Sequence, residues 1–450
     1  MTQLWFETAL LPQGWADRVR VRIEGGRIAS VETQAEPSLD DDEHHAIAIP
    51  GQCNVHSHGF QRGMAGLTEQ RGRPDDDFWS WRELMYRFLD RLDPDDIAAI
   101  TAQAYVEMLE TGYTRVGEFH YLHNAPDGRL YDAPEATAAA IVEAARQTGI
   151  GLTLLPVFYA HADFGGAPPA PGQRRFISDL DGFARLVDAS GNLLGEDDRI
   201  GIAPHSLRAV TPDELAHLLT LRPGAPVHIH AAEQTKEVDA SVAHLGARPV
   251  EWLLANADVD ARWCLVHSTH LTEAETDGLA ASGAVAGLCP VTEANLGDGI
   301  FPARRYLEAR GRFTTGTDSN IQIDVAAELR ALEYSQRLRD RARGCLATGD
   351  EASVGGRLFR AAGAGGAQAL QGEFGVAAGH SADIVSLDAD HPSLVERRGD
   401  ALLDGWIFGS NRPAVDCVWR HGKRVVTHGA HSARTEVAVR YRRTLAKLLA

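Results

Sequence analysis

The chain has 450 residues, of which 44% are hydrophobic and 24% charged, and its formal net charge at pH 7 is −18. This composition is that of a globular protein with a large core, so wholesale disorder is excluded, and no apolar run reaches the roughly 18 residues that a membrane helix needs. A strongly acidic surface repels phosphate backbones, so we expect no nucleic-acid partner. Residues 1–9 lack the basic and apolar regions of a secretory signal, and the five cysteines are scattered. These features predict a cytoplasmic protein with reduced thiols and no membrane partner.

The two ends of the chain carry the alternating apolar and polar residues of β-strands. Residues 5–31 alternate in this way and contain a Gly25-Gly26 turn, the pattern of a hairpin. Residues 382–387 and 415–426 show the same pattern near the other end. We predict that residues 1–48 and 376–450 together form a small β-sandwich-like domain, with a helix at the C-terminus.

Eight short apolar runs follow one another along the middle of the chain, and helical patterns separate most of them. The runs are residues 46–58, 114–123, 152–159, 200–206, 226–233, 263–270, 285–290 and 312–319. Asp93-Pro94 predicts the start of one of these helices, which Gly112 ends. Strands that alternate with helices favour an α/β fold, a (β/α)8 barrel of the TIM type over residues 49–375, with a doubly wound open sheet as the alternative.

A segment rich in glycine and proline, residues 162–171, follows the third run. A loop of this composition at the end of a barrel strand is either a mobile cover over the barrel mouth or a surface loop. The sequence leaves both interpretations open.

Histidine and aspartate side chains stand at the ends of four of the apolar runs. His56 and His58 end the first run, and residues i and i+2 of a strand point to the same face. His230, His267 and Asp318 end the fifth, sixth and eighth runs. Because the C-terminal ends of barrel strands meet at one mouth, we predict that these side chains surround a metal ion. Ordinary polar packing is the alternative for the H-x-H pair taken alone.

Glu233 lies three residues after His230, where a strand passes into a helix. A carboxylate at this place can face the water beside a metal ion and move its proton. Its alternative role is to complement the helix dipole. Two-metal hydrolases on this scaffold usually need an anionic bridge, often a carboxylated lysine, and none of the eight runs contains a lysine. The sequence therefore favours one metal ion.

Taken together, these residues resemble the amidohydrolase superfamily, in its mononuclear deaminase branch. The matching motifs are His56-x-His58, His230-x-x-Glu233, His267, Thr317-Asp318, and Cys289-Pro290 followed by Asn295-Leu296-Gly297. Within that branch, residues 54–62, 78–83, 118–121 and 203–208 look like segments of the formimidoylglutamate deiminases. The resemblance covers essentially the whole chain, including both β-rich ends.

The resemblance implies a role for each matching residue. One zinc ion per subunit, with iron as the alternative metal, would be held by His56, His58, His230 and Asp318. The catalytic residues would be Glu233, His267 and Asp318. The substrate would contact Gln61, Arg82, Tyr121, His205 and Arg208. The family also suggests a homodimer.

The reaction that the resemblance implies is the hydrolytic deimination of N-formimino-L-glutamate to N-formyl-L-glutamate and ammonia, a step of histidine degradation. The planar fork of arginine suits the carboxylates of this small dicarboxylate, so Arg82 and Arg208 fit an anion-binding mouth. An ion pair with Glu83 is the alternative for Arg82.

Two other functions are weighed against this one. The first is deamination of an aromatic base of the guanine or cytosine type, because a ring amidine requires the same chemistry. Rings favour stacking partners and amide edges, whereas the predicted mouth carries arginines. The second is a non-catalytic protein on the same fold, but such relatives typically lose ligands that are present here.

Overall fold

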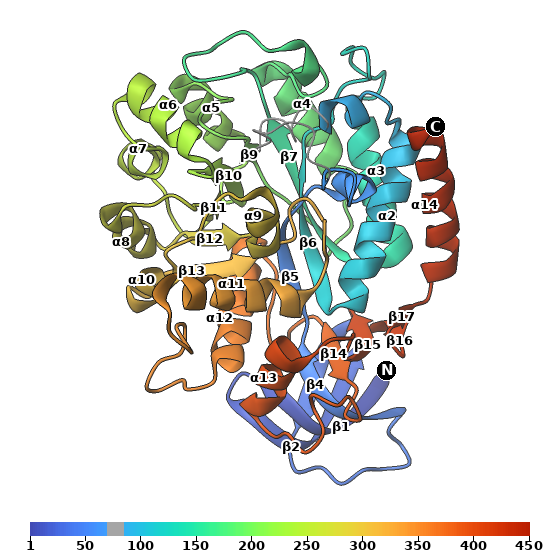
Figure 1. Cartoon of the computed structure of the whole chain (residues 1–450). Coiled ribbons are helices and arrows are strands. Elements are labelled where there is room, and N and C mark those ends of the chain that lie inside the picture. The colour runs from blue at the N-terminus through green and yellow to red at the C-terminus, as the bar shows by residue number, and fades with distance from the viewer. Residues whose placement is uncertain (70–84) are drawn as a thin grey trace.

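The computed structural model describes residues 1–69 and 85–450. Parallel strands with their helices fill the upper part of Figure 1, and the strands of the two chain ends lie together below them. All five cysteines are free thiols. No helix in the described ranges has the length and apolar character needed to cross a membrane.

Strands from both ends of the chain form one eight-stranded sheet, in the order β17-β16-β15-β14-β4-β1-β2-β3. Its strands are β1 (Thr2–Leu11), β2 (Gly14–Glu24), β3 (Arg27–Glu32), β4 (Glu43–Pro50), β14 (Ile384–Leu387), β15 (Val415–Arg420), β16 (Lys423–Thr427) and β17 (Ala430–His431). The predicted N-terminal hairpin is confirmed, since β2 and β3 pair around Gly25 and Gly26, whose φ angles of 55° and 81° suit a tight turn. β4 pairs with β14, so strands from opposite ends of the chain are neighbours.

The remaining strands form two parallel sheets. One contains β5 (Gln52–Ser57), β6 (Tyr113–His120), β7 (Gly151–Phe158) and β8 (Arg199–Ile200), with β9 (Ala203–Pro204) also paired to β7. The other contains β10 (Val227–Ala231), β11 (Trp263–His267), β12 (Val285–Leu288) and β13 (Arg312–Thr315). Isolated parallel bridges connect the two sheets at Ser57–Asp318, Ile202–Val227 and Ser206–His230. The two sheets therefore meet along both edges.

The first predicted run, residues 46–58, is wrong as a single strand. Its first part belongs to β4, where Ile47 and Ile49 pair with β14, and only β5 joins the parallel strands. The chain changes sheets at Gly51, where an added Cβ would lie 2.3 Å from the Thr114 side chain. A glycine is needed there because no side chain fits between the two sheets.

Helices separate the parallel strands and continue to the C-terminus. They are α2 (Pro94–Glu110), α3 (Ala136–Thr148), α4 (Leu180–Gly191), α5 (Pro212–Leu221), α6 (Thr235–Leu245), α7 (Pro249–Asn256), α8 (Glu273–Ser282), α9 (Pro290–Leu296), α10 (Ala303–Glu308), α11 (Val325–Asp340), α12 (Val354–Ala369), α13 (Asp400–Gly409) and α14 (Arg434–Leu449). Short 3-10 turns lie at Gly59–Met64 and Pro171–Gln173. The predicted start of α2 is confirmed, because the Asp93 side chain accepts a hydrogen bond from the Asp96 amide. The C-terminal helix α14 runs beside α2 (Figure 1). Lys447 of α14 forms ion pairs with the carboxylates of Asp93 and Asp96.

A buried group of charges connects the eight-stranded sheet to the parallel strands. The Arg420 side chain on β15 is 4% exposed, and its Nη1 lies 3.0 Å from Asp383 Oδ1. Its Nε donates to the Thr114 carbonyl oxygen at 2.9 Å, and it also pairs with Asp197. Arg115 reaches the same Asp197 carboxylate at 2.8 Å. These ion pairs connect the eight-stranded sheet to the parallel strands at the N-terminal end of β6.

Candidate metal centre

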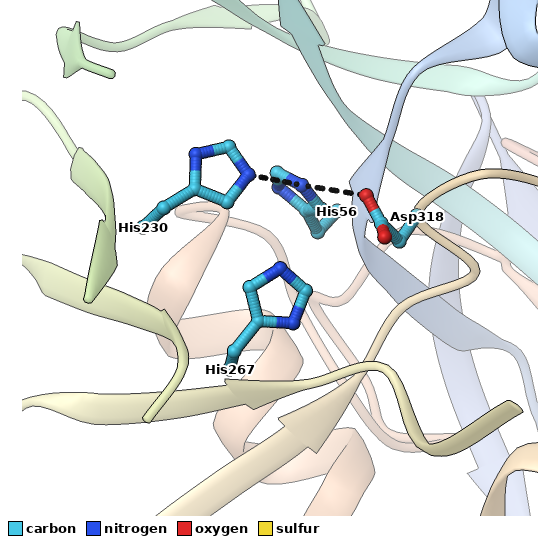
Figure 2. Close-up of side chains that lie close together, drawn as sticks. All are labelled: His56, His230, His267 and Asp318. Carbon is cyan, nitrogen blue, oxygen red and sulfur yellow. Dashed lines mark hydrogen bonds and ion pairs between the residues drawn. The ribbon is translucent and has the colours of Figure 1, made fainter. Parts of the chain in front are cut away.

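Three imidazoles and one carboxylate from four separate strand ends converge in the interior. The metal-binding atoms of His56, His230, His267 and Asp318 all lie within 4.8 Å of one another, and all four residues are buried. His56 Nε2 is 3.1 Å from His230 Nε2 and 3.2 Å from Asp318 Oδ1. Figure 2 shows the rings and the carboxylate turned toward a common centre. His58 reaches the same place, with its Nε2 3.2 Å from Asp318 Oδ1.

Backbone carbonyls determine which nitrogen of two of these rings carries a proton. His58 Nδ1 lies 2.9 Å from the Phe119 carbonyl oxygen, and His230 Nδ1 lies 3.0 Å from that of His205. A carbonyl only accepts, so both Nδ1 atoms donate, and each neutral ring keeps a lone pair on Nε2. These lone pairs point at the Asp318 carboxylate and at the His56 ring. A cation among them satisfies all these acceptors, and the set of imidazole and carboxylate donors fits a metal ion such as zinc.

Burial also prepares the ligands for a metal. It lowers the pKa of His56 to about 3, which keeps the ring neutral, as metal binding requires. Burial alone would raise the pKa of Asp318, but the imidazoles of His56 and His58, whose Nε2 atoms lie 3.2 Å from Asp318 Oδ1, outweigh it and hold that pKa well below its usual value. His56 is therefore a neutral ring beside an ionised carboxylate.

The backbone around Asp318 is held in an unusual conformation by polar side chains. Its φ is 45°, and that of His267 is 66°, in a region that residues other than glycine rarely adopt. The Asn54 side chain accepts from the Thr317 amide at 3.0 Å, and the Asn320 side chain donates to the His58 carbonyl at 3.1 Å. Such conformations persist where surrounding contacts impose them, often at functional sites.

Glu233 and His267 form a charged pair beside the converging ligands. His267 Nε2 lies 3.8 Å from Glu233 Oε1, and its Nδ1 lies 3.3 Å from Glu293 Oε1. Burial raises the pKa of Glu233. Burial opposes protonation of His267, but the carboxylates of Glu233, Glu293 and Asp318 outweigh it and raise the pKa of that ring to about 10. Without a metal ion, His267 is thus a cation among carboxylates.

Sequence reasoning missed two carboxylates of this site. Glu293, in the first turn of α9, accepts from the Cys289 amide at 2.8 Å and faces His267. Asp298 accepts from the Gln234 side chain, and burial together with the charge of Glu233 raises its pKa to about 8. The Cys289-Pro290 start of a helix was the only signal for Glu293, and it does not show which side chain the carboxylate meets.

A cavity opens next to the converging ligands. It is lined by His58, Gln61, Met85, Tyr86, Tyr121, Tyr159, Phe176, His205, Arg208, His230, Glu233, His267, Leu296 and Asp318. Four of the five predicted substrate-binding residues therefore line one cavity together with predicted metal ligands. The fifth, Arg82, lies outside the described residues, as does the predicted segment 78–83.

The cavity wall combines charge, amide and aromatic groups. Gln61 Nε2 donates to Tyr121 Oη at 2.9 Å, while Gln61 Oε1 is buried and has no hydrogen-bond partner in the described parts of the chain. The aromatic side chains of Tyr121, Tyr159 and Phe176 line the same cavity as Arg208. The expectation of a mouth distinguished by arginines rather than stacking partners is thus incomplete, because aromatic rings that follow β6 and β7 also reach the cavity.

The end of the glycine- and proline-rich loop lies near this wall. Gln173, directly after the loop, donates to Tyr159 Oη at 2.7 Å, and its side chain accepts from the Ala170 amide at 2.7 Å. This contact connects the loop to a residue of the cavity. The two interpretations of residues 162–171, a mobile cover over the mouth and a surface loop, both remain predictions.

Comparison with known proteins identifies the class of this fold and site. Residues 47–425 match the model of the amidohydrolase family, and the chain belongs to that family. Its fold is of the TIM-barrel type with α/β content. Residues 1–46 match the N-terminal domain of formimidoylglutamate deiminase HutF.

Individual relatives narrow the class further. The chain is 48% identical to formimidoylglutamate deiminase of Pseudomonas aeruginosa, over 100% of both chains. The crystal structure of an amidohydrolase from Brucella melitensis covers 100% of both chains, with 50% identity and a TM-score of 0.96. A 5-methylthioadenosine/S-adenosylhomocysteine deaminase of Natronomonas pharaonis is 32% identical, over 82% of this chain and 80% of its own.

Proposed function

We propose that this protein is a metal-dependent formimidoylglutamate deiminase, which converts N-formimino-L-glutamate and water to N-formyl-L-glutamate and ammonia in histidine degradation. The observation that carries the proposal is one cavity in which the Glu233–His267 pair, the converging imidazoles and the Arg208 guanidinium face the same space. The 48% identity over the full chain to a protein of that name supports the choice of substrate.

We propose His56, His58, His230 and Asp318 as the ligands of one zinc ion. The lone pairs on the Nε2 atoms of His58 and His230 and the ionised carboxylate support this set, and the ring of His267 stands within reach of the same centre. A bound zinc ion supplies Lewis acidity that lowers the pKa of a water molecule in such a site.

Glu233 is the proton carrier in this proposal. Its buried carboxylate lines the cavity together with His230 and Asp318, and there it takes a proton from the attacking water and delivers it to the imino nitrogen. Because burial raises the pKa of Glu233, the carboxylate holds that proton readily until the C–N bond breaks. The hydroxyl group on the tetrahedral carbon gives up the second proton of the water as its C=O bond forms, and this proton also passes to the nitrogen. The nitrogen then leaves as ammonia rather than as an amide anion.

His267 and Asp318 orient the water against the formimino carbon. Glu293 fixes the His267 ring through Nδ1, so Nε2 points toward Glu233 and the ligand group. The ring thus acts as a positioned donor toward oxygen. Asp318, whose Oδ1 lies 3.2 Å from His56 Nε2, contributes a carboxylate acceptor in the same group.

The carboxylates of the proposed substrate bind to polar and charged side chains of the cavity wall. A guanidinium binds a carboxylate with two parallel hydrogen bonds, so Arg208 is the proposed partner of one carboxylate of the small anionic substrate. Gln61, Tyr121 and His205 contribute polar groups around it, and the buried Gln61 Oε1 is suited to accept from the substrate's N–H group. Arg82 remains the proposed partner of the other carboxylate.

An aromatic-base deaminase is the second candidate, and a specific observation favours it. Four tyrosine and phenylalanine side chains line the cavity, and the Gln61 amide offers an edge that a ring could pair with. The deaminase of Natronomonas pharaonis, at 32% identity, is named for a purine nucleoside substrate. The charge of Arg208 beside those rings favours the dicarboxylate instead.

A substrate panel separates the two candidates. Ammonia release is measured from N-formimino-L-glutamate, other formimino-amino acids, guanine, cytosine and adenine nucleosides. The proposal predicts that N-formimino-L-glutamate has a kcat/KM at least about a hundredfold above every ring substrate. Comparable turnover of a purine or pyrimidine would overturn it.

A separate proposal concerns the domain boundaries of the chain. We propose that the two parallel sheets close into a (β/α)8 barrel over residues 49–375, and that residues 1–48 and 376–450 form a separate small domain. The bridges on both sheet edges and the eight-stranded sheet shared by the chain ends support this division.

A further inference from the structure

A second group of metal-type donors lies in the eight-stranded sheet, and none of its residues lines the cavity. His45 of β4 and the neighbours Asp416 and Cys417 of β15 have donor atoms within 4.8 Å of one another. His45 Nδ1 is 3.7 Å from Asp416 Oδ2, and Cys417 Sγ is 3.4 Å from the same oxygen. Neighbouring ligands of a tetrahedral zinc ion, with bonds of about 2.0–2.3 Å, stand roughly 3.3–3.8 Å apart. The two distances to Asp416 Oδ2 fall in that range.

A β-bulge explains why two consecutive residues face the same place. In a regular strand, Asp416 and Cys417 would point to opposite faces of the sheet. The ladder between β14 and β15 shifts register here, because Val385 pairs with Val418 but Leu387 pairs with Val415, which leaves one extra residue on β15. Bulges of this kind re-aim side chains, and this one directs a thiol and a carboxylate toward His45.

A fourth donor stands at the edge of the group. His428, in the turn between β16 and β17, has its Nδ1 3.0 Å from Asp416 Oδ1. The turn is held over β15 by the Gly429 amide, which donates to the Asp416 carbonyl at 2.8 Å. The His428 side chain is 87% exposed, so an ion can reach the group from solvent.

We propose that His45, Asp416 and Cys417, beside the exposed His428, form a second metal site for a divalent transition metal of the zinc type. Imidazole and thiolate donors select such ions, whereas calcium and magnesium take oxygen ligands. The site connects β4 to β15, strands from opposite ends of the chain, so an ion there stabilises the sheet that both ends build. Its role is structural and independent of the reaction in the cavity.

Binding has a defined proton balance. The metal–sulfur bond forms as the Cys417 thiol releases its proton to solvent. The affinity of this site therefore rises with pH. Cobalt reports the bond directly, because a thiolate ligand produces a charge-transfer absorption that imidazole and carboxylate ligands do not.

The test titrates the metal-free full-length protein with Co²⁺ alone and then with Zn²⁺ alone. The wild type is expected to bind two equivalents and to show the thiolate–cobalt absorption. Cys417→Ser should lose one equivalent and the absorption but keep its hydrolytic activity. Cys345→Ser, a half-buried cysteine elsewhere, is the matched control and should change neither. No thiolate–cobalt absorption in the wild type, or its persistence in Cys417→Ser, would overturn the proposal.

A second pair of variants keeps the two metal sites distinguishable. His56→Ala changes the site in the cavity and should leave the thiolate–cobalt absorption intact. His45→Gln, judged folded by circular dichroism, should lose the second equivalent of Zn²⁺ even if Cys417→Ser does not fold. Retention of both equivalents in His45→Gln contradicts the site, whatever the activity measurements show.

Discussion

Replacing Arg208 by methionine tests whether the cavity wall binds a carboxylate. The side chain is 5% exposed and lines the cavity beside Glu233 and Asp318. Methionine keeps an unbranched side chain of comparable reach but removes the charge and the five N–H donors. In the proposed complex, the substrate carboxylate then stands in a buried site without its partner.

The size of the expected effect follows from that burial. Truncating one member of a buried, hydrogen-bonded charge pair costs about 2–5 kcal/mol, and about 1.4 kcal/mol corresponds to a tenfold change. We therefore expect kcat/KM to fall by roughly 30-fold to several thousand-fold. Most of the loss should appear in KM, because the carboxylate is far from the reacting carbon and is bound equally in the ground and transition states.

A smaller effect should appear in the pH dependence of kcat. Burial raises the pKa of Glu233, and the positive charge of Arg208 opposes that rise. Removing the charge lets the pKa of Glu233 rise further. The acid limb of the kcat profile should then move to higher pH in the variant.

The assay measures ammonia release from N-formimino-L-glutamate and from its two mono-amide analogues. Arg208→Met should be severely impaired with the dicarboxylate, but for one of the two analogues the wild type and the variant should be nearly equal. Arg222→Met, which removes a surface arginine paired with Asp188, is the control and should have unchanged kinetics. An unchanged KM in Arg208→Met, or equal losses with all three compounds, would refute the anion-binding assignment.

Four further predictions concern two residues of the candidate site and two buried ion pairs elsewhere in the fold. His230→Ala should lose bound metal and activity together, by elemental analysis and ammonia release, and an active, metal-replete variant would contradict the ligand set. Glu233→Gln should retain the metal but lose kcat by about two to four orders of magnitude; a kcat within tenfold of the wild type would exclude it as proton carrier. Arg420→Met should lower the free energy of unfolding in urea by about 3–5 kcal/mol, since it leaves the Asp383 carboxylate without its ion pair and Asp197 with Arg115 alone, and an unchanged midpoint would contradict this role of Arg420. A hydrogen bond from Arg20 lowers the pKa of Asp41 to about 2, so its stabilisation is present above an unfolded-state pKa of about 3.9 and is lost as the pH falls through 2. Asp41→Asn should be less stable at neutral pH and show a flatter decline of stability between pH 4 and pH 2; an identical decline would contradict this pair.

The parts of the fold that depend on local sequence were predictable. The Asp93-Pro94 start of α2 and the Gly25-Gly26 turn follow from backbone preferences of neighbouring residues, and both appear as predicted. The first run reads as one strand because the buried end of β4 continues into the buried strand β5 and only Gly51 separates them. Which sheet each half joins depends on partners that lie 39 or more residues away.

The candidate site also has a part that the sequence predicts and a part that only the tertiary structure shows. The sequence by itself determined that His56, His230, His267 and Asp318 stand at strand ends, because strand periodicity is written in consecutive residues. Only the tertiary structure decided that their ligand atoms lie within 4.8 Å, that carbonyls of Phe119 and His205 fix the ring protons, and that Glu293 faces His267. These contacts join residues far apart in the chain, and their distances depend on how whole strands pack rather than on any local pattern.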